Sequence, residues 1–170
     1  GLLPLGLSYA VFRLIHFLVE AHRGRIRRAA FTDLTAFVFF FPTWLAGPVE
    51  RFPRFREQSA PRAFDPGDVS AVLARILRGA FRNLVVADSL APHVLGVLGA
   101  PEQSSVVSVV VAIHLLAVWL YMDFGGYTDV ALGFARLFGY RVVENFDHPF
   151  FRTSIAAFWR SWHVSLYSFI

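Results

Sequence analysis

The run "SVVSVVVAIHLLAVWLYM" (residues 105–122) is the clearest candidate for a membrane-spanning helix, because its eighteen residues carry no acidic side chain, Arg or Lys. A transmembrane helix needs about 20 mainly apolar residues to cross about 30 Å of hydrocarbon. Residues 84–100 are also apolar, apart from Asp88, Ser89 and His93, and "PEQSS" (residues 101–105) stands between the two runs. We therefore predict two apolar helices joined by a tight hairpin turn.

The composition of the whole chain supports a membrane protein. Of its 170 residues, 56% are hydrophobic and 16% are charged, whereas soluble domains are about a quarter charged. We expect an all-α, multi-pass transmembrane protein. The chain has no cysteine, which excludes a thiol nucleophile, disulfides and thiolate metal sites.

The net charge of +4 comes from Arg residues that are spread between apolar runs. No folded basic module is visible, so we expect no nucleic-acid partner and assign these residues to lipid headgroups and membrane orientation.

Two further apolar segments lie near the N-terminus. Residues 2–19 read as a span, and residues 37–49 are apolar but short and broken by Pro42, Gly47 and Pro48. Arg residues gather after each segment, so both sets belong on the cytoplasmic side and the "PEQSS" turn on the opposite side. Residues 37–49 then read as a re-entrant segment. The alternative is an ordinary span with one misleading flank.

Residues 65–82 predict an interfacial amphipathic helix. Asp65 is a suitable N-cap, and Pro66 suits the first turn. Arg75, Arg78 and Arg82 share one face, which we expect to lie against lipid headgroups or simply in solvent.

Ionisable residues inside apolar segments are costly and therefore candidate site residues. Arg13, His16 and Glu20 form one stripe, read either as a structural Arg13–Glu20 pair or as a cavity wall. His114 stands alone within its run and is expected to hydrogen-bond to a neighbouring helix.

The stretch "YMDFGGYTDVALGFARLFGY" (residues 121–140) combines glycines with carboxylates. We expect residues 125–126 to end the long helix, Thr128 to cap a new one, and Gly139 to stop it. Asp123 and Asp129 need partners, with Arg136 or Arg141 as candidates. They serve as caps and ion pairs or line a polar tunnel.

The last residues predict one final helix, capped by Thr153 or Ser154 and continuing to the end of the chain. His163 falls at the edge of its apolar arc, beside Trp159 and near Arg160. Desolvation and a nearby cation both favour the neutral imidazole that a general base requires. A structural, hydrogen-bonded histidine is the alternative.

Five ordered motifs resemble the membrane-bound O-acyltransferases, in particular the bacterial branch that is similar to the alginate O-acetyltransferase membrane subunit. The matching segments are "PLGLSYAVFRLIHFLVEAHRG" (4–24), "FFFPTWLAGPVERFPRF" (39–55), "YMDFGGYTDVALGFARLFGY" (121–140), "NFDHPF" (145–150) and "FWRSWHVSL" (158–166). Ser161, Glu50 and Phe150 depart from residues common in that family.

The resemblance implies a bacterial inner-membrane enzyme that moves an acyl group, such as acetyl, from a cytoplasmic thioester to hydroxyls of an exported polysaccharide. The donor would be acetyl-CoA or a carrier-protein thioester, with no bound cofactor or metal. Besides the lipid bilayer, an extracytoplasmic acetyltransferase is an implied partner. Residues 1–170 would form a single partial domain, truncated at both ends.

In this reading His163 matches one of two recurring histidines, and the other, which the resemblance implies is the central catalytic one, belongs to a downstream Trp-His-Gly motif outside this sequence. Arg160, Trp159 or Trp162 would help to stabilise the oxyanion. Asp123, Tyr127 and Asp129 would lie on the tunnel. A non-enzymatic transporter or channel, and an inactive fragment, remain the alternatives.

Overall fold

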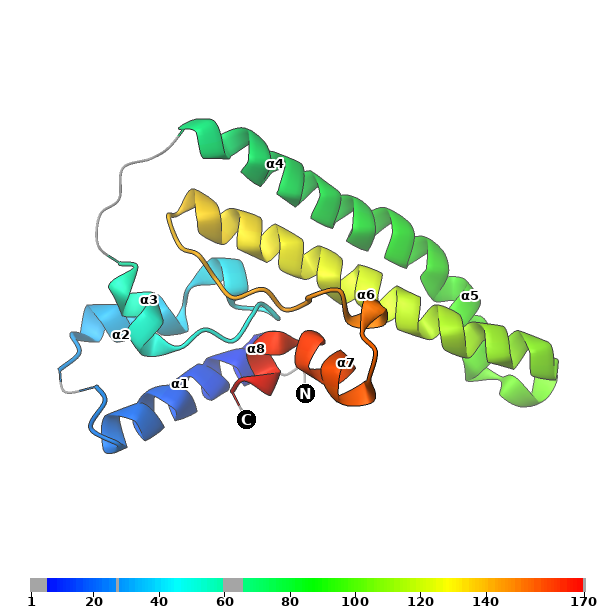
Figure 1. Cartoon of the computed structure of the whole chain (residues 1–170), viewed down its shortest axis with the longest axis horizontal. Coiled ribbons are helices and arrows are strands. Elements are labelled where there is room, and N and C mark those ends of the chain that lie inside the picture. Colours follow the sequence, from blue (N-terminus) through cyan, green and yellow to red (C-terminus); the bar gives the residue numbers. More distant parts are fainter. Residues whose placement is uncertain (1–5, 27, 60–65, 170) are drawn as a thin grey trace.

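The structure, a computed structural model, describes residues 6–26, 28–59 and 66–169 (Figure 1). Within these ranges every regular element is a helix, which confirms the predicted all-α class. The elements are α1 (Leu7–His22), α2 (Phe31–Val38), η1 (Phe41–Thr43), α3 (Phe52–Glu57), α4 (Pro66–Ala80), η2 (Phe81–Ala87), α5 (Asp88–Gly99), η3 (Pro101–Gln103), α6 (Val106–Leu137), η4 (Pro149–Phe151), α7 (Ile155–Ser161) and α8 (Val164–Tyr167).

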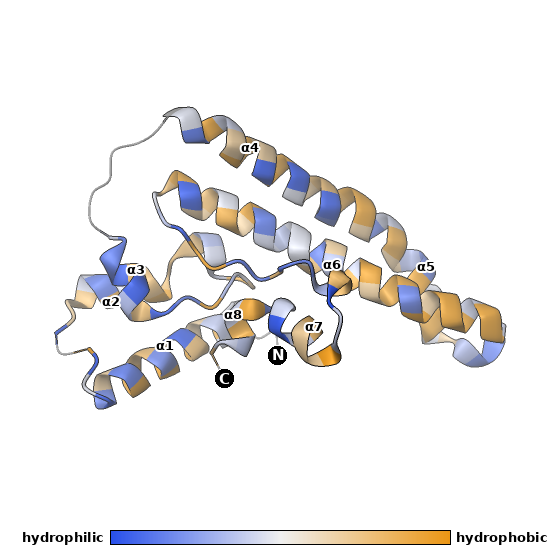
Figure 2. Ribbon diagram, in the orientation of Figure 1, coloured by the Kyte–Doolittle hydropathy of each residue, from blue (hydrophilic) through white to orange (hydrophobic). Residues whose placement is uncertain are grey.

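A long helical hairpin forms one half of the molecule. The continuous rod α4–η2–α5 lies along α6, and η3 makes the turn between α5 and α6 (Figure 1). This confirms the hairpin predicted from "PEQSS". The end of the hairpin near η3 is predominantly apolar on α5 and α6 (Figure 2).

Helix α6 is the one element among the described residues that is long and apolar enough to cross a membrane. Its 32 residues span about 48 Å at 1.5 Å per residue, which exceeds the hydrocarbon thickness. Val106 and Val107 at its start are 80% and 72% exposed, as expected of side chains that face lipid. Further spans and the re-entrant path of residues 37–49 stay predictions.

The predicted break at Gly125 and Gly126 is wrong, because α6 continues through both glycines. Their role is close packing: a Cβ on Gly126 would lie 2.7 Å from the backbone oxygen of Gly79 in α4. Thr128 is no cap, since its hydroxyl donates to the Phe124 carbonyl within the helix at 2.8 Å. The predicted stop at Gly139 is confirmed by its φ of +81° just after the helix.

The segment η2 between α4 and α5 is a π-helix, a wider winding than the α-helices on either side. The bounds of α4 confirm a helix that begins at Pro66, whereas the predicted N-cap Asp65 lies outside the described residues. The predicted headgroup-facing Arg row is wrong for Arg75 and Arg82. Both side chains reach α6, where a carboxylate binds them.

The N-terminal helices form a second, smaller group around an aromatic core. Phe37 of α2 contacts Phe52 and Phe55 of α3, with both ring-centroid distances 5.4 Å. Ala10 of α1 and Val38 belong to the same buried cluster. After α2 the chain passes through η1 and then runs without helix to Arg51.

The predicted final helix is also wrong in part, since it breaks between Ser161 and Val164 into α7 and α8. Its predicted cap is confirmed: the Ser154 hydroxyl accepts a hydrogen bond from the Ala157 backbone N–H at 3.2 Å. Apolar periodicity continued through the break, whereas the backbone at His163 turns into the left-handed region.

Candidate functional site

His163 lies at the junction of α7 and α8, with φ 50° and ψ 52°. This left-handed conformation costs a non-glycine residue about 1–2 kcal/mol, although histidine is among the residues that tolerate it better. The turn is supported by a neighbouring segment. The Val164 N–H donates to the Asn145 carbonyl at 2.9 Å, and the Asp147 N–H donates to the Ser161 carbonyl at 3.0 Å.

The His163 imidazole packs against α6. Its ring meets Phe124 edge to face, with centroids 4.8 Å apart. Burial lowers the pKa of the His163 imidazole below its ordinary 6.5, so the ring is neutral at pH 7. Its Nε2 is buried and has no hydrogen-bond partner within the described ranges. Buried polar atoms are nearly always paired, so this unpaired nitrogen requires an explanation.

A buried hydrogen-bond network lies next to His163. The Ser165 hydroxyl donates to Asn145 Oδ1 at 2.5 Å and accepts from the Val49 N–H at 3.0 Å. Sequence reasoning missed Asn145 and Ser165. The only available signal was that "NFDHPF" and "FWRSWHVSL" both belonged to the family resemblance.

Aromatic side chains form a wall beside the histidine. Trp162 packs against Phe146 at 5.0 Å and stacks on Phe158 at 5.6 Å between ring centroids. Trp159 and Arg160, also predicted as supporting residues, are exposed. Trp159 packs on Phe158, and neither residue hydrogen-bonds to or stacks on His163 in the described structure.

The three tunnel candidates of α6 have separate partners. Asp123 accepts a hydrogen bond from Asn83 Nδ2 at 2.7 Å, and the Tyr127 hydroxyl accepts one from the Ala46 N–H at 3.2 Å. The structure therefore does not bring Asp123, Tyr127 and Asp129 together around His163. Each instead joins α6 to a neighbouring segment.

Asp129 is the centre of an ion-pair cluster between α4, η2 and α6. Its carboxylate accepts from Arg75 Nε at 3.0 Å and from Arg82 at 2.8 Å. Arg75 also binds Glu144 at 2.7 Å, next to Asn145. The predicted partners Arg136 and Arg141 are wrong. Arg136 pairs with Asp68, and the Arg141 backbone N–H binds Gln58.

The Arg13–His16–Glu20 stripe divides into three separate contacts, so the predicted Arg13–Glu20 pair is wrong. Glu20 pairs with Arg25 at 2.9 Å. His16 Nε2 accepts from the Phe52 N–H at 3.2 Å, at the start of α3. His114 was expected to bind a neighbouring helix, but its Nδ1 lies 2.8 Å from the Val110 carbonyl of its own helix.

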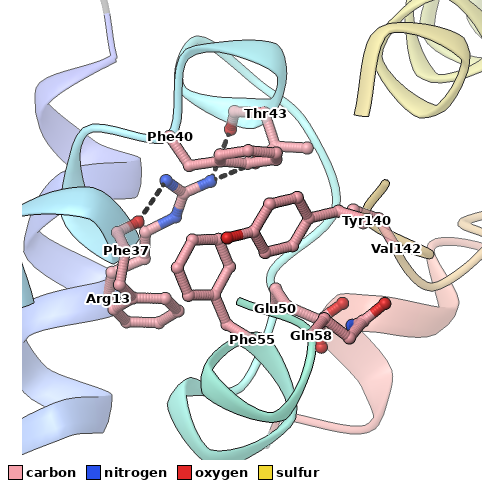
Figure 3. A pocket seen from close by; sticks show the side chains of 9 residues that line it. All are labelled: Arg13, Phe37, Phe40, Thr43, Glu50, Phe55, Gln58, Tyr140 and Val142. Atoms are coloured by element: carbon pink, nitrogen blue, oxygen red, sulfur yellow. Dashed lines mark hydrogen bonds between the residues drawn. The ribbon is translucent and has the colours of Figure 1, made fainter. Parts of the chain in front are cut away.

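Arg13 itself is 1% exposed and faces a tightly filled pocket (Figure 3). Its guanidinium donates to the carbonyls of Phe37, at 2.9 Å, and Val38, at 3.1 Å. It also donates to the carbonyl and hydroxyl of Thr43. Phe55 and Tyr140 stack across the pocket with centroids 4.7 Å apart. Arg13 therefore anchors the segment that leads to Val49, and Val49 in turn is hydrogen-bonded to Ser165.

The sequence matches the membrane-bound O-acyltransferase family over residues 8–170, and the chain belongs to this family. It is 35% identical to a probable alginate O-acetylase of Azotobacter vinelandii, over 97% of this chain and 33% of the relative.

Two other relatives act on different polymers, to judge by their names. The chain is 29% identical to the teichoic acid D-alanyltransferase of Bacillus subtilis, over 95% of the chain and 42% of the relative. It is 26% identical to the peptidoglycan O-acetyltransferase of Helicobacter pylori, over 99% of the chain and 37% of the relative. The chain thus spans about a third of the length of the alginate O-acetylase relatives it matches.

Proposed function

We propose that the full-length protein is a membrane O-acyltransferase in which His163 is a general base. The observation that carries this proposal is the buried Nε2 of His163, which has no partner in the described structure and belongs to a ring that burial keeps neutral. Family membership supports acyl transfer over a passive channel.

In the proposed reaction this nitrogen accepts one proton and later gives it up. The acceptor hydroxyl oxygen attacks the thioester carbonyl carbon while the imidazole takes its proton. The resulting tetrahedral oxyanion collapses, the C–S bond breaks, and the leaving thiolate takes a proton from the imidazolium. General base catalysis of this kind contributes about 10²–10⁴-fold.

Aromatic packing around the site serves the same reaction by keeping water away from the thioester. Trp162 and Phe124 are the rings best placed to exclude water, because Trp162 precedes His163 in the chain and Phe124 contacts the His163 ring. We propose Arg160 and Trp159 as oxyanion donors only in the full-length protein, because both side chains are exposed in the present structure.

The finer assignments rest on the relatives. We propose an acetyl-CoA or carrier-protein thioester donor on the cytoplasmic side of the bacterial inner membrane, and a polysaccharide hydroxyl on the other side. An extracytoplasmic acetyltransferase is the proposed partner. Relatives named for alginate, teichoic acid and peptidoglycan support an exported polymer as acceptor.

The test uses membrane vesicles that contain the full-length protein, labelled acetyl donor and polysaccharide. Free acetyl-CoA and an acetylated carrier protein are supplied in separate arms. His163→Asn should abolish transfer while keeping membrane insertion, because Asn also tolerates a left-handed backbone.

His148→Asn is the matched control. His148 has a similar left-handed backbone, with φ 45°, but is exposed. It should retain transfer. Full activity of His163→Asn would remove this residue from the mechanism, and absence of transfer by the wild-type protein with either donor would sink the proposed function.

A further inference from the structure

We propose that Asn145 and Ser165 are positioning residues for His163, which they hold in place through a buried latch of hydrogen bonds. This inference rests on the proposed function of His163. The latch is defined as the Ser165 hydroxyl bonded to Asn145 Oδ1, together with the Val164 N–H bonded to the Asn145 carbonyl.

Both residues of the latch are inaccessible to solvent. Asn145 is 0% exposed and Ser165 is 1% exposed, so an unpaired polar group there is costly. The Ser165 hydroxyl and Asn145 Oδ1 satisfy each other, whereas Asn145 Nδ2 has no hydrogen-bond partner within the described residues. Asn145 binds the two residues that follow His163: its backbone carbonyl binds residue 164, and its side chain binds residue 165. Two attachments one residue apart fix the direction in which the chain leaves His163.

The backbone of His163 requires such support. A left-handed non-glycine residue persists only where the surrounding structure determines it. On the other side of the turn, Phe146 and Trp162 form an isolated antiparallel bridge. The chain is therefore held both before and after His163, and Phe124 limits where the imidazole can lie.

The latch also joins the histidine to a distant segment. The Ser165 hydroxyl accepts from the Val49 N–H, and Val49 follows the loop that Arg13 anchors. Residues 49, 145 and 165 are therefore bonded through one hydroxyl. Loss of that hydroxyl removes the bond to Val49 and the side-chain part of the latch, whereas the Val164–Asn145 backbone bond and the aromatic packing of Trp162 remain.

The experiment compares Ser165→Ala with Ser165→Thr in the full-length protein in membrane vesicles. Ser165→Ala removes the hydroxyl, and Ser165→Thr keeps it. We expect Ser165→Ala to lower kcat by about 10²-fold with little change in KM for the donor, since misplacement of a catalytic group by about 1 Å costs that much. Ser165→Thr should restore most of the rate.

Ser168→Ala is the matched control, because Ser168 follows the same short helix and, among the described residues, its hydroxyl bonds only the Ser165 carbonyl. It should keep the wild-type kcat. In a second variant, Asn145→Leu keeps the side-chain size and the backbone bond but removes Oδ1. It should reproduce the kcat loss of Ser165→Ala, with wild-type amounts of protein in the membrane.

Two results would overturn the latch. One is a wild-type kcat for Ser165→Ala in a protein that His163→Asn inactivates. The other is an equal loss in Ser165→Ala, Ser165→Thr and Ser168→Ala, which would indicate damaged packing. A wild-type protein without transfer activity would instead contradict the proposed function.

Discussion

Arg75 of α4 and Asp129 of α6 are joined by a 3.0 Å hydrogen bond between Nε and Oδ1, and Arg82 binds the other carboxylate oxygen at 2.8 Å. One carboxylate thus bridges two guanidinium groups between packed helices, and Glu144, which also binds Arg75, supplies the second negative charge. Because Arg75 also binds Glu144, the cluster reaches the segment that carries Asn145.

Replacing Asp129 by Ala should destabilise the protein, since it leaves Arg75 and Arg82 without their shared partner. The side chains are 12–27% exposed, so the loss should fall below the about 3–5 kcal/mol measured for fully buried pairs. The thermal unfolding midpoint in detergent measures it. Asp147→Ala, which breaks the exposed pair with Arg152, is the control and should cost at most about 1 kcal/mol. Equal midpoints for the two variants would contradict this role of Asp129.

Gly126→Ala should push α4 and α6 apart. The new Cβ would lie 2.7 Å from both the Asn83 backbone nitrogen and the Gly79 carbonyl, and backbone atoms cannot move aside individually. We expect a loss of about 1–3 kcal/mol in unfolding free energy. Gly96→Ala, where a Cβ would meet nothing within 4 Å, should be neutral or stabilising by up to about 1 kcal/mol. If Gly126→Ala unfolds at the wild-type midpoint, the close approach is not required.

The pH dependence of transfer should follow the His163 imidazole. Burial lowers its pKa below 6.5, so the base form persists at pH 6.5 and is lost at lower pH. The acid limb of kcat/KM should therefore have its midpoint below 6.5, and stability should fall as pH drops below 6.5, because the unfolded chain then binds the proton more readily.

Phe124→Ala should move that acid limb upward, toward 6.5, because it removes the ring that covers one side of the imidazole. Phe151→Ala, at an exposed aromatic residue, serves as the control and should leave the limb in place. An acid limb above 6.5 in the wild-type protein would mean that another group titrates.

Arg13→Lys should loosen the loop after α2. Lysine cannot reproduce the guanidinium fork that reaches Phe37, Val38 and Thr43, and each lost charged hydrogen bond costs about 1.5–3 kcal/mol. Hydrogen exchange of residues 37–51 should quicken by at least about 10-fold. Arg23→Lys, at an exposed residue, should leave exchange there unchanged. Unchanged exchange in Arg13→Lys would show that the aromatic core alone holds the loop.

The hydropathy pattern predicted the hairpin of α5 and α6, and residue type predicted a cap at Thr153 or Ser154, because both features depend on residues that are neighbours in the chain. Gly139 was predicted for the same reason. Gly125 and Gly126 were misread, because their small size serves contact with a second helix. The partners of Asp129 and Glu20 were also misread, since ion pairing depends on how separate segments meet.

At the candidate site, motif resemblance pointed to His163 but to neither member of the latch. The break at His163 could not be read from apolar spacing, because Phe158, Trp162 and Leu166 keep a helical period across it. The backbone there depends on Asn145, eighteen residues earlier, and sequence patterns reveal no such pairing.

The wider turns of η2 set the angle, measured about the helix axis, between the side chains of α4 and those of α5. Gly79 in α4 and the buried Val94 in α5 belong to the two arms that pack on α6. A change in the number of residues at positions 81–87 would alter the rotation and the rise that relate Gly79 to Val94, and therefore the way in which Val94 meets α6. Chain length in this short stretch is therefore constrained together with the Arg82 and Asn83 side chains, which bind α6 from it.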